Sequence, residues 1–576
     1  MGTLCLQSRH IRGTTRAVCV VTLEAEGGPR RPRDEDRPFR PLAYARRVKA
    51  DEAARTEPAP ARRLAWSTAI FAAATGLSRV FGLVREIVAR NYFGVQGSIN
   101  AFEIAFLIPN TVRALVADAA LSGAFVPVFG ELLEKGNRAR AWRVASTLFW
   151  LMLIGLGTLT ALFVLLAPWL MSPFPYKQDL LVGLSRILFP LVLLLGLSGI
   201  VVGILNSYEH FTVPALTPVF WNAVIILGLV IGVPLVESED AKLYVYAGAI
   251  LAGTAVQFLV PLPWLRGRGG RLQLVLDWRD PAVRRVFVLM LPVTLALGLI
   301  NVNALINAVF AAKLIDPDIA PSAINAAFRI YMLPQGIFSV AVATVLFPRL
   351  ARLAARADLD GFRETVSLGL RQIGFLLLPA SAVSAVLAVP IVRLAYERGA
   401  FTAGQTTVVA GALAAFSLGL TFNGTMLMLN RAFFSLQSPW TPTAIALGNL
   451  GLNAALATAF YRVGVWGLPL ATSLVNIAGT GALLFVFRRR LGRVDGARLV
   501  DSYLRIAVAS ALAAGAAFAV WYGLDAAVGR SVAGQLLSVG GALGVSVGLY
   551  VALARAFSIR ELEVLLSLRR RSATTS

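Results

Sequence analysis

The chain has 576 residues, of which 57% are hydrophobic and 15% charged, with a formal net charge of +23. Soluble proteins carry about 25% charged residues, so this composition excludes a soluble globular protein and indicates an integral membrane protein. The only cysteines are Cys5 and Cys19, and the only histidines are His10 and His210. We therefore expect no disulfide framework, no cysteine- or histidine-based metal site and no catalytic histidine, and no catalytic residues are assigned.

The first 64 residues differ from the rest of the chain. They are polar, contain basic clusters at 30–33 and 62–63, and show no sustained apolar periodicity. Such a segment is typical of a disordered, basic cytoplasmic tail. A translation start assigned too far upstream is the alternative explanation for it.

Apolar segments long enough to cross a hydrocarbon core of about 30 Å recur from Trp66 onward. They predict an all-α polytopic membrane protein with about fourteen transmembrane helices. The approximate spans are 66–92, 99–130, 143–171, 180–205, 213–236, 243–265, 284–312, 320–348, 364–394, 405–435, 440–461, 464–487, 502–524 and 533–556.

The loops between these spans alternate in charge. Basic residues gather in the loops at 135–143, 266–279, 349–363 and 488–498, whereas the loops at 172–179, 237–242 and 313–318 each hold a single lysine beside acidic residues. Because short cytoplasmic loops are enriched in Lys and Arg, both termini of this multi-pass protein are predicted to be cytoplasmic. The basic loops fit anionic membrane lipids as partners, and no nucleic acid is expected.

The sequence repeats two of its features at nearly one spacing. Pro109 and Pro334 lie 225 positions apart, and Asn206 and Asn430, each preceded by leucine and followed by two prolines, lie 224 apart. This predicts two pseudo-symmetric six-helix lobes, 65–265 and 266–490, followed by a helix pair and basic cytoplasmic tail in 491–576. Transporters built from repeats place their substrate site between the halves.

Of the arginines inside the apolar spans, four are candidates for function, namely Arg79, Arg85, Arg113 and Arg329. A charged side chain at the bilayer centre costs at least about 2.5–3.5 kcal/mol, so each one requires a partner. The planar guanidinium stays ionised and donates paired hydrogen bonds to phosphates. We therefore predict that these arginines bind an anionic substrate; the alternative is internal pairing with embedded carboxylates.

Neighbouring residues support such a cavity. Asn110 and Arg113 lie three residues apart on one helix face, directly after Pro109. Arg90 is expected to reach the membrane interface as a snorkelling side chain. The predicted supporting residues are Glu86, Asn110 and Asp118, and the predicted hinges are Gly82, Pro109 and Pro334.

Several long motifs carry a family resemblance. They read SRVFGLVREIVARNYFG (78–94), NAFEIAFLIPNTVRALVADAALSGAFVPVF (100–129), ILNSYEHFTVPALTPVFWN (204–222), LPQGIFSVAVATVLFPRL (333–350) and ERGAFTAGQT (397–406). The chain resembles the MurJ (MviN) family of lipid II flippases, within the multidrug/oligosaccharidyl-lipid/polysaccharide exporter superfamily.

The resemblance implies a function and a substrate. It implies a transporter, not an enzyme, located in the bacterial cytoplasmic (plasma) membrane. This transporter moves lipid II, an undecaprenyl-pyrophosphate-linked disaccharide-pentapeptide, from the inner to the outer leaflet by alternating access for peptidoglycan synthesis. Cell wall synthesis proteins are the implied protein partners. No cofactor or metal is implied, and the membrane potential or a monovalent cation is the hypothesis for energy coupling.

The chain departs from the family pattern at acidic positions. Asn100, counted among the residues that support the cavity, stands where the family commonly has Asp, and Phe328 stands where it has an acidic residue. Two alternative functions stay open: an exporter of another polyprenyl-linked glycan or a multidrug antiporter of the same superfamily, and a membrane-embedded polyprenyl-phosphate glycosyltransferase.

Overall fold

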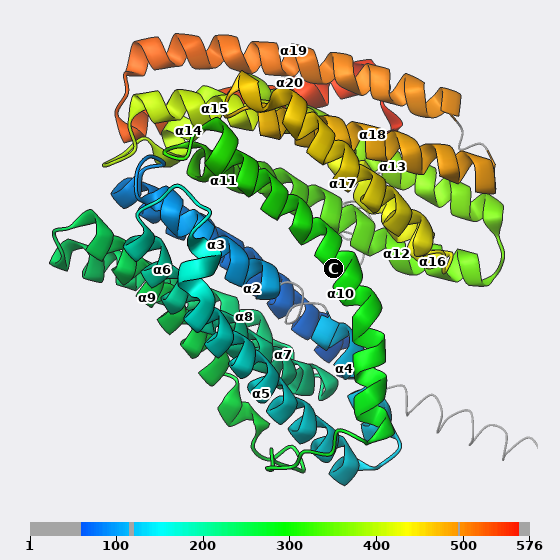
Figure 1. Ribbon diagram of the computed structural model, residues 1–576. Helices are drawn as coiled ribbons and strands as arrows, with labels where there is room; N and C mark the ends of the chain where they lie inside the picture. The colour runs from blue at the N-terminus through cyan, green and yellow to red at the C-terminus, as the bar shows by residue number, and fades with distance from the viewer. Residues whose placement is uncertain (1–58, 114–119, 493–495, 564–576) are drawn as a thin grey trace, which may run out of the picture. The chain divides into compact units, whose positions relative to one another are not determined.

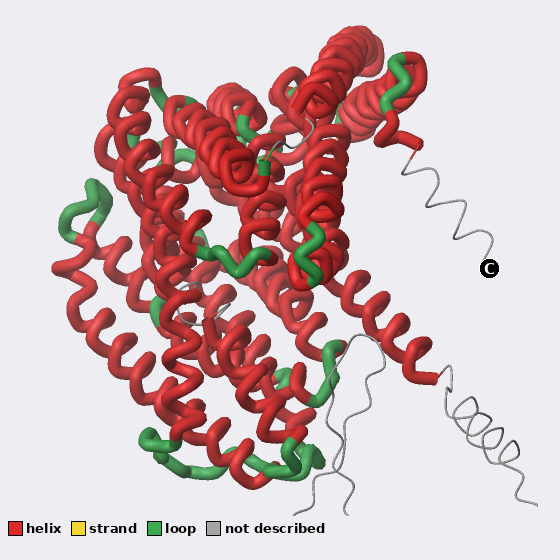
Figure 2. Tube along the Cα trace, turned by 90° about the vertical axis from the view of Figure 1, so that its right-hand side faces the viewer, coloured by secondary structure: helices red, strands yellow, loops and turns green. Residues whose placement is uncertain are grey.

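The computed structural model describes residues 59–113, 120–492 and 496–563, and these residues form helices and connecting loops without a β-strand (Figures 1 and 2). The chain divides into two units, Met1–Ala65 and Trp66–Ser576. Most of the predicted tail, and Asp118, lie outside the described residues. The all-helical prediction is confirmed for the described part of the chain.

The first helices of the second unit share one apolar core, which includes Phe125, Phe129 and Leu188. Asn137 caps the helix that begins at Arg138 by accepting a hydrogen bond from the Arg140 amide, and Pro190 begins a new helix directly after the one that ends at Leu188. These helices are α2 (Ala59–Phe93), α3 (Ile99–Arg113), α4 (Ala120–Glu134), α5 (Arg138–Met171), α6 (Gln178–Leu188), α7 (Pro190–Ser207), α8 (Thr212–Leu227) and α9 (Glu239–Leu259).

A separate apolar core, with Phe362, Phe433 and Phe487 at its centre, joins the helices from α11 to α18. Helix α10 connects the two groups, since it packs against α3 and α4 and also against α17. The bounds are α10 (Pro281–Phe310), α11 (Ala320–Pro334), α12 (Val340–Ala355), α13 (Leu359–Val386), α14 (Ala388–Tyr396), α15 (Ala403–Leu418), α16 (Leu420–Ser435), α17 (Trp440–Phe460) and α18 (Gly467–Leu491).

Several of the predicted spans are interrupted helices, among them 320–348 and 405–435. Pro334 ends α11 and is followed by a π-helical turn, η6 (Gln335–Ser339), before α12 begins. Helices α15 and α16 meet at an angle of 43° next to Gly419, where a Cβ atom would lie 2.7 Å from the Cα of Ser473. Helix α2, by contrast, continues unbroken through Gly82, so the structure has no helix break at this predicted hinge.

The C-terminal helices α19 (Gly496–Val528) and α20 (Val532–Ala556) pack against each other, and α19 lies along α13. The Tyr550 hydroxyl donates a hydrogen bond of 2.7 Å to the Phe375 carbonyl of α13. Four residues later Pro379 has no N–H to offer this carbonyl. Tyr550 therefore supplies from α20 the donor that proline removes from α13.

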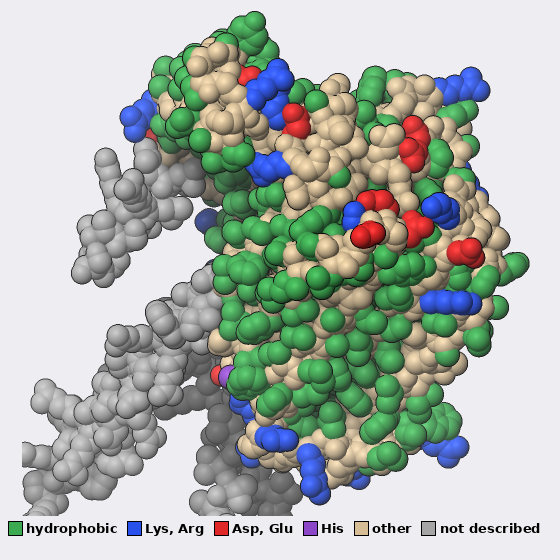
Figure 3. All heavy atoms as spheres, turned by 90° about the vertical axis from the view of Figure 1, so that its left-hand side faces the viewer, with side chains coloured by type: hydrophobic (Ala, Val, Ile, Leu, Met, Phe, Trp, Pro, Cys, Tyr) green, Lys and Arg blue, Asp and Glu red, His purple; other side chains and the backbone are tan. Residues whose placement is uncertain are grey.

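The structure confirms a membrane protein of many spans. Ten helices are long and apolar enough to cross a bilayer, and the bent pair α15–α16 makes up to eleven, by length and composition among the described residues. Figure 3 shows a broad apolar field on the face it draws, between a lower edge bearing Lys and Arg and an area with Asp and Glu. Helix α2 is not among these ten helices. It contains four charged side chains, Arg79, Arg85, Glu86 and Arg90, which lower its mean hydropathy.

The turn between α2 and α3 joins the two helix groups. Val95 is fully buried in the second core, and its amide donates a 3.1 Å hydrogen bond to Gln405 Oε1. The Asn100 side chain donates to the Asp318 carbonyl at 2.5 Å and accepts from the Ser322 amide at 2.9 Å. These contacts fix the start of α3 against α11, and so set the distance between the helices that carry the embedded arginines.

Candidate functional site

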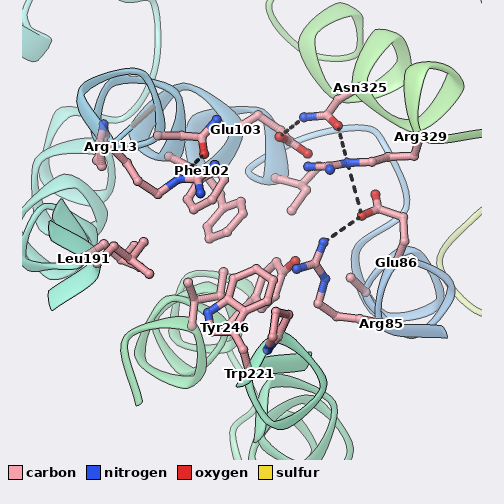
Figure 4. Close-up of a pocket in the computed structure, with 18 of the residues that line it drawn as sticks. Arg85, Glu86, Phe102, Glu103, Arg113, Leu191, Trp221, Tyr246, Asn325 and Arg329 are labelled. Carbon is pink, nitrogen blue, oxygen red and sulfur yellow. Dashed lines mark hydrogen bonds and ion pairs between the residues drawn. The ribbon is translucent and has the colours of Figure 1, made fainter. Parts of the chain in front are cut away.

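A cavity of about 460 Å³ lies between α2, α3, α7, α8, α9 and α11 (Figure 4). Its charged lining consists of four arginines and two glutamates, an excess of two positive charges, and its apolar wall comes mainly from α3, α7 and α8. The lining residues are Arg85, Glu86, Ala89, Arg90, Ile99, Phe102, Glu103, Phe106, Pro109, Asn110, Arg113, Leu191, Leu195, Pro218, Trp221, Tyr246, Ile250, Gln257, Asn325 and Arg329.

Arg90 is the most deeply buried charge of this cavity, with a side chain only 3% exposed. Its Nη2 lies 2.8 Å from Glu86 Oε1 and 2.9 Å from Glu103 Oε1, and Nη1 donates to the Ser322 hydroxyl. The expectation that Arg90 snorkels to the interface is wrong. Its partners on α2, α3 and α11 surround it with carboxylate and hydroxyl groups, so the buried guanidinium is paired within the protein.

Arg85 faces the cavity with its hydrogen-bonding capacity largely unused. Its guanidinium carbon lies 4.8 Å from the ring centroid of Trp221, and its Nη2 lies 3.8 Å from Glu86 Oε2. Its Nε is buried and has no hydrogen-bond partner among the described residues. A buried donor without a partner is costly, so this position is suited to an acceptor that arrives with a ligand.

Arg329 approaches the same carboxylate from α11. Its Nε lies 3.9 Å from Glu86 Oε2 and donates a 3.2 Å hydrogen bond to Asn325 Oδ1, one helical turn earlier. The Asn325 amide in turn donates to Glu103 Oε2 at 2.6 Å. With a side chain 41% exposed, Arg329 is held in position from one side and is accessible from the other.

Arg113 lies at the last residue of α3, one turn after Pro109. Its Nε donates a 3.1 Å hydrogen bond to Asn110 Oδ1, so the two side chains lie on one helix face, as their spacing predicts. Pro109 also lines the cavity. The proline leaves one backbone carbonyl without its helical donor, and a cavity is where such a group is tolerated at membrane depth.

The structure therefore brings Arg85, Arg113 and Arg329 to one cavity, together with the predicted neighbours Glu86 and Asn110. Other predicted residues lie elsewhere. They are Arg79, which is exposed and lies against Gly336; Gly82, which faces Asn222; Asn100, which joins backbone groups of two turns; and Pro334, which ends α11.

Four further lining residues, which are not among the predicted site residues, complete the cavity. Trp221 holds its ring under Arg85 and donates its indole N–H to Thr254 Oγ1 at 3.0 Å. Asn325 precedes Arg329 by four residues, a helical spacing that would have identified it. Glu103 and Tyr246 complete the wall around Arg90, and no local pattern in the sequence links them to it.

This arrangement is suited to binding an anion between arginines. Within the described residues there is no cluster of three His, Cys, Asp or Glu side chains that would hold a metal ion. The cavity offers guanidinium groups, side-chain amides and aromatic rings. These groups bind phosphates and planar or sugar-like groups but do not form a nucleophile with its base.

The sequence matches a family model described as "Lipid II flippase MurJ" over residues 89–530. A protein of Vibrio cholerae, named probable lipid II flippase MurJ, is 32% identical over 87% of this chain and 97% of its own length. This chain belongs to the MurJ family. Another member of the family, the lipid II flippase MurJ of Burkholderia cenocepacia, is 30% identical over 73% of this chain and 82% of its own length.

Solved structures show the same fold. A structure titled "Lipid II flippase MurJ, inward closed conformation" matches with a TM-score of 0.69 and 24% identity, and the match covers 84% of this chain and 99% of that one. An inward-facing multidrug transporter of the MATE family, in the MOP superfamily, matches with a TM-score of 0.61 and 15% identity over 73% and 96% of the two chains. The MurJ family therefore shares its helical architecture with multidrug exporters that differ from it in sequence.

Proposed function

We propose that this protein is a flippase that translocates lipid II from the inner to the outer leaflet of the cytoplasmic membrane for cell wall synthesis. One observation carries the proposal: Arg85, Arg113 and Arg329 face a single cavity. Arg90 makes the short contacts with both glutamates of that cavity. With four arginines and two glutamates in its lining, the cavity is suited to an anionic ligand, and lipid II bears a pyrophosphate.

The chemistry of the three arginines fits a pyrophosphate. Two bridged phosphate groups offer acceptors in several directions, and guanidinium groups from α2, α3 and α11 approach the cavity from different sides. The unpartnered Nε of Arg85 is a donor for one of these oxygens. Phe102, Phe106 and Trp221 add apolar and aromatic surface beside the charges, which suits the sugar rings of the headgroup.

The finer architecture belongs to the same proposal. The chain has about fourteen spans, in two pseudo-symmetric six-helix lobes with a C-terminal pair, and both termini lie in the cytoplasm. The α2–α3 turn is then external, and its hydrogen bonds to Gln405 and Asp318 hold the outer side closed. Alternating access requires these contacts to break, and the helix interruption after Pro334 is a place where α11 bends against α12.

Energy coupling follows from the charge that is moved. Transfer of negative charge outward is favoured by an inside-negative potential, by about 2.3 kcal/mol per charge per 100 mV. We propose the membrane potential or a monovalent cation as the driving force. Flipping in proteoliposomes that continues unchanged after valinomycin collapses an imposed potassium potential would refute the first version.

A multidrug antiporter of organic cations is the competing function within the same fold. A cavity that binds cations requires a negative or purely aromatic lining, whereas this one has an excess of two positive charges. An exporter of another polyprenyl-linked glycan shares the pyrophosphate and is distinguished only by its headgroup. The translocation rates of labelled lipid II and of a different polyprenyl glycan decide between these two substrates.

The test is translocation of fluorescent lipid II in proteoliposomes that contain the purified protein. We expect Arg113→Ala and Arg329→Ala to abolish translocation. The control is Arg462→Ala, which should leave translocation unchanged because Arg462 is exposed and does not line the cavity. The two cavity variants, Arg113→Ala and Arg329→Ala, should also fail to complement a flippase-depleted bacterium although they are expressed. Normal growth with both cavity variants would refute the assignment.

A further inference from the structure

The segment between η4 (Leu262–Leu265) and α10 lies against the first turns of α5. The Gln273 amide donates to Ser146 Oγ at 3.0 Å, and the Asp277 amide donates to Thr147 Oγ1 at 3.2 Å. The indole of Trp150 donates to the Gln273 carbonyl at 2.8 Å. A segment with neither helix nor strand is thus fixed to one helix through its backbone.

Large apolar side chains of this segment point away from the protein. Leu274 is 79% exposed, Leu276 46% and Trp278 63%. Adjacent exposed side chains of this size in a loop mark a surface that contacts something apolar. Tryptophan in particular is enriched where a membrane meets water.

Positive charge accompanies these side chains. The loop carries four arginines, Arg266, Arg268, Arg271 and Arg279, with Asp277 as its acidic residue before Asp280. Asp280 is neutralised by Arg140, whose Nη2 lies 2.9 Å from its carboxylate. The excess of positive charge complements an anionic surface.

The position along α5 agrees with such a surface. This helix has 34 residues, about 51 Å at 1.5 Å per residue, whereas the hydrocarbon core is about 30 Å thick. The helix is thus longer than the hydrocarbon core is thick, so its end turns lie at the level of the lipid headgroups. Ser146 and Thr147, in the third turn of α5, lie near that level.

We propose that residues 271–279, the interfacial segment, dock into the cytoplasmic leaflet: Leu274, Leu276 and Trp278 enter the acyl boundary, and the flanking arginines bind anionic lipid phosphates. The proposal rests on the proposed cytoplasmic position of this loop but not on the identity of the substrate. Because Asp280 caps α10 directly after the segment, the connection between the two helix groups is held at the membrane surface.

The test uses spin labels on the full chain with Cys5 and Cys19 replaced by serine, in nanodiscs that contain phosphatidylglycerol. Leu276→Cys places a label on the interfacial segment, and Asp360→Cys places one at a side chain 91% exposed at the start of α13. We expect the label at 276 to collide more with oxygen and less with a water-soluble nickel chelate than the label at 360. Equal nickel accessibility at the two positions would overturn the docking.

Lipid charge is tested with the same label. Arg271→Gln together with Arg279→Gln should raise nickel accessibility at position 276 in phosphatidylglycerol nanodiscs, and should have no effect in phosphatidylcholine nanodiscs. An equal response in both lipids would overturn the role of the arginines. Lipid II translocation is measured in parallel, so a failure of the proposed function is separate from a failure of membrane docking.

Discussion

Arg90 Nη2 lies 2.8 Å from Glu86 Oε1, the shortest arginine–carboxylate contact of the cavity. Arg85 and Arg329 lie 3.8 and 3.9 Å from the other oxygen of the same carboxylate. One arginine is therefore committed to internal pairing, and two are oriented by the carboxylate without being neutralised by a close contact. We therefore expect substitution of Arg90 to lower stability, and substitution of Arg85 or Arg329 to weaken ligand binding instead.

Arg90→Ala is expected to destabilise the protein strongly. It leaves Glu86 and Glu103 buried without their close partner, and breaking a buried pair in this way costs about 3–5 kcal/mol. Thermal unfolding of the purified protein in detergent should show a marked decrease in Tm. Arg85→Ala is the matched control and should change the Tm little. An equal decrease for both variants would contradict the distinction between Arg90, which stabilises the protein, and Arg85, which is available to the ligand.

Glutamine at both acidic positions should offset the loss of Arg90. In the variant Arg90→Ala/Glu86→Gln/Glu103→Gln the cavity contains no buried unpaired carboxylate at these sites, so much of the lost stability should return. A triple variant that is no more stable than Arg90→Ala would show that Arg90 does not stabilise the protein by pairing with the two glutamates.

Arg329→Lys should bind lipid II more weakly than the wild type but more tightly than Arg329→Ala. Lysine keeps the charge and loses the planar pair of donors. Loss of a charged hydrogen bond costs about 1.5–3 kcal/mol, so alanine should weaken binding by about 10- to 150-fold. Binding of labelled lipid II in detergent, compared with Arg462→Ala, measures this order; identical affinities of the lysine and alanine variants would contradict it.

The sequence predicts the cavity better than it predicts the pairing inside it. Embedded arginines and the spacing of Asn110 and Arg113 are local signals, and they identified residues that the structure places together. The prediction that Arg90 reaches the membrane interface is wrong because its partners include residues of other helices, such as Ser322, which lies 232 residues away. Such contacts depend on how helices pack, which no local period encodes.

Helix packing also explains why some of the predicted residues lie outside the cavity. Arg79 shares a helix with Arg85, but six residues of helix separate them by more than a full turn, and Arg79 contacts Gly336 instead. The helical fold followed from hydropathy, whereas the break at Gly419 depends on its close approach to Ser473. Close approach between helices is a property of the packed structure.

The C-terminal pair offers a prediction about helix docking. Tyr550→Phe removes the donor for the Phe375 carbonyl and should lower the Tm slightly, since interhelical hydrogen bonds in membranes contribute about 0.6 kcal/mol on average. Gly374→Ala should lower it more, because its Cβ would lie 2.7 Å from the Tyr503 ring. Thermal unfolding measures both, and a larger effect of Tyr550→Phe than of Gly374→Ala would contradict this order.

The Arg140–Asp280 contact predicts a dependence on pH. Hydrogen bonds from Arg140 hold the pKa of Asp280 below its usual value. A lowered pKa contributes stability above the unfolded pKa, near 3.9, which is lost as the pH falls through the folded pKa. Asp280→Asn keeps the helix cap and removes the charge. The Tm difference between wild type and variant should be present at pH 7 and vanish under strong acid; a constant difference would contradict it.

A cryo-EM structure of the protein with bound lipid II tests the central claim most directly. The account predicts pyrophosphate density in the cavity, within hydrogen-bonding distance, about 3 Å, of guanidinium groups of Arg85, Arg113 and Arg329, with Arg90 still paired to Glu86 and Glu103. Pyrophosphate density outside this cavity, with the three guanidinium groups left without contact to it, would contradict the claim.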